Sequence, residues 1–254
     1  MKYKTSEFEY GFRYSGRKDI GKHRSTNQDE VILCPDIGVF AVSDGMGGLE
    51  QGAKASEYVR QSIPVMMRFA KKEARTAVAA GCAFAETLRM ISDNLFNTAN
   101  TESYIGFGAT FCGVWLYGNK AVFANLGDSR GYLLPKYKKT IRQVTEDHNI
   151  AAMLVKNGEL SKNAAKNHPS SVRLTRFVGM ESPALPEYFI YDVDPGDRIL
   201  LCSDGLYGML DDEDITRMMR SSRSPGTVCE RLIDKANENG GRDNISVVYV
   251  EITR

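Results

Sequence analysis

Short apolar runs and alternating apolar positions divide much of the chain into segments with the length of β-strands. A first strand is predicted over 8–15, where aromatic residues occupy every second position. Apolar runs separated by glycine-containing turns predict a β-meander over 107–145, with antiparallel neighbours because the connections are short. The strands of the meander are expected at 110–117, 121–126, 130–134 and 139–144, and further strands at 30–34, 38–43, 187–193, 197–203 and 244–252.

Helical spacing, with apolar residues three or four positions apart, begins after Gly48. It predicts a helix near 53–63, which Pro64 should end or kink, and a second helix over 73–98 with Val78 on its apolar stripe. Later helices are expected at 149–157, 161–166, 211–220 and 224–239. Antiparallel strands with helices grouped in pairs indicate an α+β fold, in which the helices cover the outer faces of the sheets.

The 254 residues suffice for one large domain or two small ones. We expect one domain over 1–254, with a candidate mobile flap at 146–185, where apolar content is lowest. The net charge of +1 provides no overall field that favours nucleic acid or an anionic membrane. We expect no signal peptide, because the N-terminal MKYKTSEFEYGF contains no apolar segment, and no membrane span, because no apolar run approaches ~20 residues. Five scattered cysteines without a CxxC spacing predict reduced, buried thiols in a cytoplasmic protein.

Aspartates stand at the ends of several predicted strands. In VFAVSDGMGG an apolar run leads into Ser43, Asp44 and Gly45, and LLCSDGL repeats this design at Asp204. Asp243 precedes the last strand, and Asp29 precedes the strand at 30–34. A carboxylate at the end of a core strand needs a cation or a full set of hydrogen-bond donors. If these strand ends converge, their oxygen ligands suit Mg²⁺ or Mn²⁺ better than Zn²⁺ or copper.

Two divalent cations held by carboxylates can hydrolyse a phosphoester without a protein nucleophile. Asp44 is the candidate bridging ligand, the Gly45 carbonyl could bind one ion, and Asp204 and Asp243 could bind the other. Asp29 could orient a water molecule bound to the metals.

The loop before Asp29 brings two further polar residues towards the same place. Arg24 could bind a substrate phosphate, although its spacing also suits an ordinary surface arginine. Asn27 is expected to support the ligands from outside the metal shell.

Other polar residues have structural interpretations that we prefer. Asp128 is expected to cap its own turn and pair with Arg130, and Asp147 also reads as structural. The three histidines, His23, His148 and His168, are expected in loops or at the surface rather than as metal ligands.

Seven segments, in the same order, resemble the metal-dependent (type 2C, PPM) serine/threonine protein phosphatases of the stand-alone bacterial branch. These are RSTNQD (24–29), VSDGMGG (42–48), GATFCGV (108–114), ANLGDSRGYLL (124–134), TEDHN (145–149), LLCSDGL (200–206) and RDNISVV (242–248). The resemblance implies a four-layer αββα sandwich of two antiparallel sheets flanked by helix pairs, with a binuclear Mn²⁺ or Mg²⁺ centre at one end.

The resemblance also implies a role for each site residue. Asp44 would bridge both metals, the Gly45 carbonyl would bind one, and Asp204 and Asp243 would hold one metal. Asp29 would contact bound water and Arg24 the substrate phosphate, while Asn244 would orient Asp243. Two positions depart from family patterns. Met46 replaces a histidine of the animal members, and no acid is found near Ile105, where many bacterial members hold a third, weaker metal.

The function implied is hydrolysis of phosphoserine and phosphothreonine in proteins, opposing a bacterial serine/threonine kinase. The expected cofactors are two Mn²⁺ or Mg²⁺ ions per chain, and the expected partners are phosphorylated proteins and a kinase, with the chain a monomer. Two alternatives stay open: a regulatory phosphoprotein-binding pseudophosphatase with weak turnover, and a phosphatase of small phosphoesters.

Overall fold

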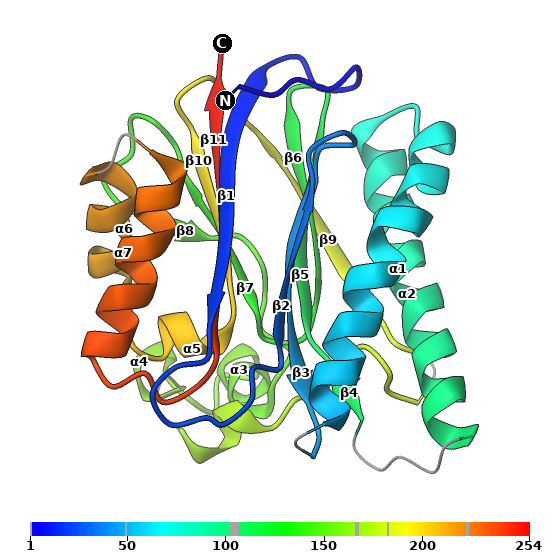
Figure 1. Ribbon diagram of the computed structural model, residues 1–254, viewed down its shortest axis with the longest axis vertical. Helices are drawn as coiled ribbons and strands as arrows, with labels where there is room; N and C mark the ends of the chain where they lie inside the picture. The colour runs from blue at the N-terminus through cyan, green and yellow to red at the C-terminus, as the bar shows by residue number, and fades with distance from the viewer. Residues whose placement is uncertain (1, 49, 102–106, 166–167, 182, 222–223) are drawn as a thin grey trace.

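The computed structural model describes residues 2–48, 50–101, 107–165, 168–181, 183–221 and 224–254. Its strands form two antiparallel sheets that pack face to face, and helices cover the outer face of each sheet (Figure 1). The layers therefore follow the order helix, sheet, sheet, helix. The predicted α+β class and the four-layer αββα sandwich are confirmed.

One sheet contains the first and the last strands of the chain. Its strand order is β1 (Gly11–Asp19), β11 (Ile245–Thr253), β10 (Arg198–Cys202), β7 (Arg130–Leu134) and β8 (Arg142–Gln143). Helices α6 (Asp212–Ser221) and α7 (Pro225–Glu238) lie on its outer face (Figure 1). Their apolar sides bury Ile215, Met219 and Leu232 against the sheet.

The second sheet contains strands that come before and after the consecutive helices α1 and α2 in the chain. Its order is β2 (Asp29–Cys34), β3 (Val39–Met46), β5 (Phe111–Tyr117), β6 (Lys120–Leu126) and β9 (Glu187–Asp192), with β4 (Gly108–Ala109) paired to the end of β3. Helices α1 (Gln51–Glu73) and α2 (Ala77–Thr101) cover its outer face, where Val59, Phe84 and Trp115 are fully buried. Between the two sheets lies a further apolar layer that includes Phe40 and Val248.

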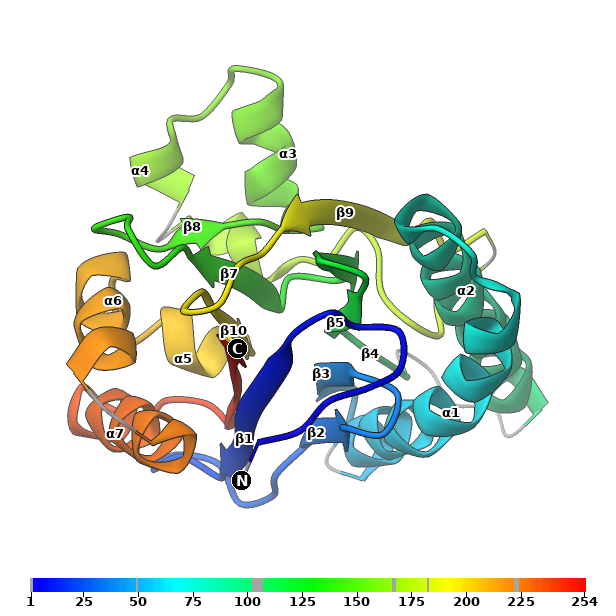
Figure 2. The same cartoon turned by 90° about the horizontal axis from the view of Figure 1, so that it is seen from above.

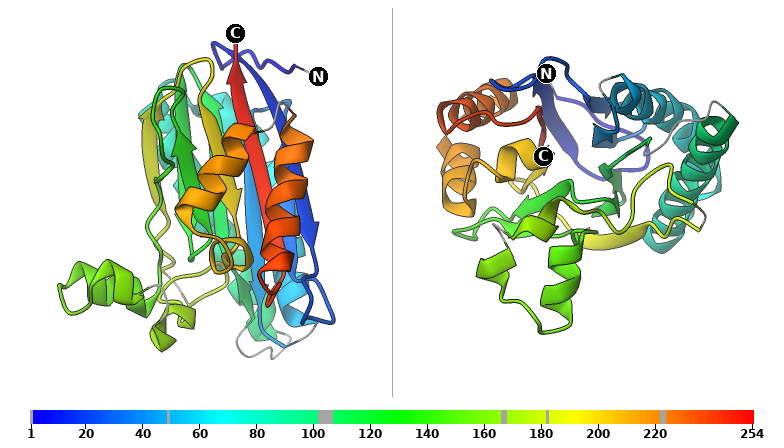
Figure 3. Two further views of the ribbon diagram at one scale, coloured as in Figure 1. Left: turned by 90° about the vertical axis from the view of Figure 1, so that its left-hand side faces the viewer. Right: turned by 90° about the horizontal axis from the view of Figure 1, so that it is seen from below.

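Part of the segment 146–185 stands apart from these layers, whereas Val178 pairs with Ala109 and is buried in the core beneath α1 and α2. The segment contains α3 (Ile150–Lys156), α4 (Lys162–Ala165) and a short 3₁₀ helix, η1 (Pro169–Val172). Figures 2 and 3 show α3 and α4 projecting from the body of the sandwich, near one end. That this segment acts as a mobile flap stays a prediction.

The boundaries of β1 differ from the prediction. The strand begins at Gly11 and continues to Asp19, through residues expected to form a loop. Each of its residues pairs with one in β11, from Gly11 opposite Thr253 to Asp19 opposite Ile245. The long partner strand therefore extends β1 beyond its aromatic part. The strand predicted at 139–144 is shorter than expected, because only Arg142 and Gln143 pair with β7.

The prediction that Pro64 ends the first helix near Gln61 is wrong, because α1 continues through Pro64 to Glu73. That Pro64 kinks the helix stays a prediction. A proline inside a helix removes one backbone donor. Here Ile63 and Met67 are fully buried on either side of it, so packing against the sheet maintains the helix. The second helix starts later than predicted, at Ala77, and Val78 is 58% exposed rather than on the apolar stripe.

The cysteines are all free, and four of them are buried: Cys34, Cys112, Cys202 and Cys229. Cys82 on α2 is exposed, contrary to the prediction. Among the described helices, none combines the length and apolar character required to cross a bilayer.

Candidate metal centre

The candidate site lies at the end of the sandwich opposite the chain termini. At this end β2 and β11 begin and β3 and β10 finish, so both sheets contribute (Figure 1). Asp29 and Asp44 are directly opposed residues of neighbouring strands. Asp204 follows β10, and Asp243 precedes β11, which pairs with β10. The structure therefore brings the four predicted aspartates to one end of the molecule.

Asp29 is fully buried at the first position of β2. Its Oδ2 accepts a hydrogen bond from the Ser203 hydroxyl at 2.7 Å, and its backbone N–H donates to Asn27 Oδ1 at 3.0 Å. Within the described part of the chain, Asp29 Oδ1 has no hydrogen-bond partner. A buried carboxylate oxygen without a donor is costly, so this atom fits a contact with a cation or its water.

Backbone contacts with Thr110 and with α1 fix the positions of Asp44 and Gly45. The Asp44 N–H donates to Thr110 Oγ1 at 3.0 Å, and the Asp44 carbonyl accepts from Thr110 N at 2.7 Å. A Cβ on Gly45 would lie 2.0 Å from the carbonyl oxygen of Gly52 in α1. The glycine after the aspartate is therefore required for backbone contact with α1, a constraint that the sequence pattern alone did not reveal.

The second Ser-Asp-Gly motif follows the same rule. A Cβ on Gly205 would lie 1.9 Å from the carbonyl oxygen of Asn244. Ser203 was not predicted as a site residue, yet its hydroxyl donates to Asp29 and accepts from Ser246 N at 2.9 Å. This serine connects the two sheets behind the carboxylates, and the repeated serine before Asp-Gly was the available signal for it.

Arg24 lies beside the predicted ligands and pairs with one of them. Its Nη2 donates to Asp243 Oδ2 at 2.6 Å, and the guanidinium side chain is 49% exposed. The pKa of Arg24 is raised chiefly by this hydrogen bond, with smaller contributions from Asp44 and Asp204. A half-exposed guanidinium at the rim of an acidic site is suited to meeting a phosphate.

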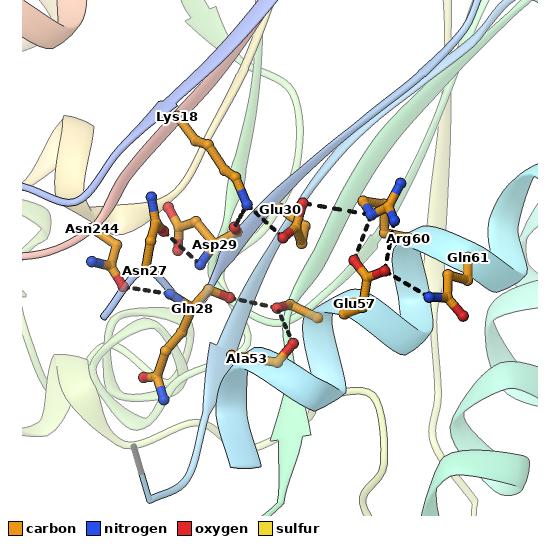
Figure 4. A network of polar contacts seen from close by, with 11 residues as sticks. Lys18, Asn27, Gln28, Asp29, Glu30, Ala53, Glu57, Arg60, Gln61 and Asn244 are labelled. Carbon is orange, nitrogen blue, oxygen red and sulfur yellow. Dashed lines mark hydrogen bonds and ion pairs between the residues drawn. The ribbon is translucent and has the colours of Figure 1, made fainter. Parts of the chain in front are cut away.

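Asn27 and Asn244 hold the loop that precedes β2 (Figure 4). Asn244 Oδ1 accepts from Gln28 N at 2.8 Å, and its Nδ2 donates to the carbonyls of Ile20 and Thr26. The Asn244 backbone N–H donates to Asp243 Oδ1 at 2.8 Å. Asn244 thus contacts Asp243 through its backbone and uses its side chain to fix the neighbouring loop.

The carboxylates are electrostatically unfavourable to one another. Burial, followed by repulsion from the other acids, raises the pKa of Asp29 to about 7 and that of Asp204 to about 6. The same two causes raise the pKa of Asp44 well above its usual value. Asp204 Oδ1 has no hydrogen-bond partner among the described residues. A bound cation would relieve both the repulsion and these unpaired oxygens, so the donor set fits hard divalent ions.

In the structure, the described acidic side chains are not arranged closely around a common position for an ion. Within the described ranges, no group of three or more acidic, histidine or cysteine side chains meets the geometry of an assembled ion site. The ligand assignments of Asp44, Gly45, Asp204 and Asp243 therefore stay predictions. The position near Ile105, where a third metal was considered, lies outside the described residues.

Asp128 differs from its predicted role. The expected pair with Arg130 does not form, because the Arg130 guanidinium binds Asp147 in a two-point ion pair, with Nη2 2.6 Å from Asp147 Oδ2. Asp128 is buried, and its pKa is raised to about 8 by burial and then by Asp204. It therefore lies within electrostatic reach of the predicted ligands.

His148 is buried rather than in a loop or at the surface, as had been predicted. Its Nδ1 accepts a hydrogen bond from Gly127 N at 3.1 Å, and Nε2 lies 3.2 Å from Glu187 Oε2. His23 is exposed and His168 is half-buried, as expected of loop residues.

Comparisons with known proteins agree with this arrangement. A family model described as Protein phosphatase 2C matches residues 19–235. The chain belongs to the protein phosphatase 2C family. A curated relative, the serine/threonine phosphatase stp of Listeria monocytogenes, is 34% identical over 242 residues, which cover 92% of this chain and 94% of the relative.

Solved structures of protein phosphatase 2C relatives superpose over nearly the whole chain. The serine/threonine phosphatase of S. agalactiae gives a TM-score of 0.86 at 27% identity, covering 95% of this chain and 99% of that one. The catalytic domain of PstP, solved with two manganese ions, gives a TM-score of 0.78 at 26% identity and covers 96% and 99% of the two chains.

Proposed function

We propose that this chain is a metal-dependent protein phosphatase that hydrolyses phosphoserine and phosphothreonine in proteins. The observation that carries the proposal is the meeting of four aspartates from both sheets at one end of a protein phosphatase 2C fold. Matched relatives are named as a serine/threonine phosphatase and as a protein phosphatase, which does not favour the binding-only alternative.

Asp44, the Gly45 carbonyl, Asp204 and Asp243 would hold two Mn²⁺ or Mg²⁺ ions. Such ions lower the pKa of a coordinated water and stabilise the negative charge that develops on the phosphoryl group. Asp29, held by the Ser203 hydroxyl, keeps one free oxygen with which to orient a water molecule. Asn27 fixes the backbone of Asp29, and Asn244 fixes that of Gln28, so the loop that carries Arg24 is held in place.

Arg24 would bind the phosphate of the substrate. Its guanidinium has more donors than the single Asp243 contact uses, and half of the side chain faces solvent. A phosphorylated side chain entering from solvent would therefore meet Arg24 beside the carboxylates. The further proposals are that a serine/threonine kinase supplies the phosphoprotein substrates and that the chain works as a cytoplasmic monomer.

The deciding experiment measures Mn²⁺-dependent release of phosphate from a phosphothreonine peptide. Asp44→Ala should abolish turnover. Asp36→Ala, which removes an exposed carboxylate that pairs with Arg68 on the surface, should leave turnover unchanged. Turnover that persists in Asp44→Ala, or that proceeds equally in EDTA, would contradict the proposal.

A further inference from the structure

The helix that begins with Asp204 is too short to hold its own orientation. It consists of one turn, α5 (Asp204–Tyr207). An isolated turn of helix is unstable in water, because fixing its dihedral angles costs more than its single hydrogen bond returns. The Ser203 hydroxyl, which stands at its N-terminus, is engaged with Asp29 and Ser246 instead. The direction of Asp204 therefore depends on how the rest of α5 is anchored.

Gly205 and Leu206 supply part of the anchorage. Gly205 contacts the backbone of Asn244, and Leu206 is fully buried in the apolar layer beneath α6 and α7. Tyr207 supplies a further part. Its hydroxyl donates to the Asp128 carbonyl at 3.0 Å, and the Arg130 guanidinium stacks on its ring, with Cζ 3.6 Å from the ring centroid.

Arg130 is itself rigidly held. Its Nε and Nη2 bind the Asp147 carboxylate, and Nη1 donates to the Tyr132 hydroxyl at 3.2 Å. Asp147 also accepts from Gln143 Nε2 at 2.8 Å. Only a planar guanidinium can form the two-point ion pair and lie flat on the Tyr207 ring at once. The side chain is 20% exposed, so solvent screens these contacts only weakly.

We propose that Arg130 is a positioning residue for Asp204, acting through the ring of Tyr207. Residues three apart in a helix lie on the same side, so displacement of the Tyr207 ring turns α5 and moves the Asp204 carboxylate. The inference rests on the proposed function, since it takes Asp204 as a metal ligand. Arg130 touches neither the substrate nor the ions and contributes only through the orientation of α5.

The rival interpretation is that Arg130 only neutralises Asp147, whose side chain is 11% exposed. In that case its loss lowers the stability of the metal-free protein and leaves metal affinity unchanged. A positioning role changes metal affinity instead, because groups that orient metal ligands are each worth roughly 10- to 100-fold in affinity. The two interpretations therefore differ in a direct binding measurement that does not involve catalysis.

The test is calorimetric titration of Mn²⁺ into the metal-stripped full chain, with melting temperatures in EDTA measured in parallel. Arg130→Lys keeps the charge but loses the fork and the stacking, and Tyr207→Leu removes the ring. Each should bind Mn²⁺ about tenfold more weakly. Tyr207→Phe keeps the stacked ring and should stay within about twofold of the parent chain.

The matched control is Arg13→Lys. Arg13 forms a comparable ion pair with Glu251 between β1 and β11, near the opposite end of the strands from Asp243. This variant should lose stability without any change in Mn²⁺ affinity. If Arg130→Lys behaves in the same way, the proposal is overturned.

Three other results have fixed meanings. If Arg130→Lys does not fold, the comparison of Tyr207→Leu with Tyr207→Phe decides, and equal Mn²⁺ affinities in the two overturn the proposal. If Tyr207→Phe binds Mn²⁺ as weakly as Tyr207→Leu, the hydroxyl rather than the Arg130 stack is responsible, which also overturns it. Absence of Mn²⁺ binding by the parent chain overturns the proposed function itself.

Discussion

The metal-free protein should become less stable as the pH rises, and Asp29 provides the sharpest test. Burial and the neighbouring acids raise the pKa of Asp29 from 3.8 to about 7 in the folded chain. The folded state therefore binds a proton that the unfolded state has released between these two pH values. The contribution of Asp29 to the free energy of unfolding is therefore highest near pH 3.8 and falls until the pH passes about 7.

The size of the effect follows from the same values. Each unit of pKa difference corresponds to about 1.4 kcal/mol, so ionised Asp29 costs about 4 kcal/mol at pH 8. Asp29→Asn removes this charge, and its amide oxygen can still accept from Ser203. In EDTA at pH 8 the substitution should raise the free energy of unfolding by about 4 kcal/mol, which is roughly 10 °C in melting temperature.

At pH 5 the gain from Asp29→Asn should shrink to about 2 kcal/mol, because the folded parent chain already carries the proton. The assay is urea denaturation of both proteins in EDTA at the two pH values. The pKa of His148 is lowered by burial, but both proteins contain this residue, so its effect cancels in the difference. Asp36→Asn, the same substitution at an exposed surface carboxylate, provides the control.

Saturating Mn²⁺ should remove the advantage of Asp29→Asn at pH 8, because the cations balance the ionised carboxylates of the parent chain. An equal gain at pH 5 and pH 8 in EDTA would refute the reasoning. So would a parent chain whose metal-free stability does not change between these pH values.

Other substitutions test individual assignments. Asp204→Asn should lower turnover of a phosphothreonine peptide by more than about 100-fold, because loss of a metal ligand should cost at least as much as loss of a group that orients one. The melting temperature of this variant in EDTA should not fall. Near-normal turnover would remove Asp204 from the ligand set. Arg24→Ala should lower kcat/KM for that peptide by about 10- to 100-fold through loss of a charged hydrogen bond; unchanged kinetic constants would make Arg24 an ordinary surface residue. Gly45→Ala should cost about 2 kcal/mol in urea denaturation, because its Cβ would strike the Gly52 backbone. The control is Gly48→Ala, whose Cβ would meet only the end of the Gln51 side chain at 3.9 Å; equal stability of the two variants would contradict the steric argument.

The sequence was most informative where a local pattern and a tertiary constraint coincide. Asp44 and Asp204 each follow an apolar run of strand length, and both runs form buried strands, so the placement of the aspartates near strand ends was readable. The glycine that follows each aspartate was also visible in the sequence. Its steric reason was not, because the backbones that the glycines approach, at Gly52 and Asn244, are not adjacent to them in sequence.

Partners distant in sequence were not readable. Arg130 stands two residues from Asp128, and the turn between them suggested a pair. The actual partner, Asp147, reaches Arg130 only after the chain has passed through β8. His148 lies in a polar stretch that is typical of a loop, and contacts with Gly127 and Glu187 bury it.

The same limit applied to the helices and to β1. Proline has the lowest helix propensity of all residues. At Pro64 the burial of its neighbours against the sheet outweighs this unfavourable propensity, so the helix continues. The extent of β1 was set by its partner β11, more than two hundred residues away in the chain. Element types were therefore predictable, and their ends depended on contacts that a single sequence does not contain.

The origin of the carboxylates in both sheets has a kinetic consequence. Asp29 and Asp44 come from one sheet, and Asp204 and Asp243 adjoin the other, so the ligand set is complete only after the two sheets have docked. Ions that bind this set stabilise the native state and not the earlier, partly folded transition state. Mn²⁺ should therefore slow unfolding while leaving the refolding rate nearly unchanged. The metal would prolong the lifetime of the folded enzyme without helping the chain to reach it.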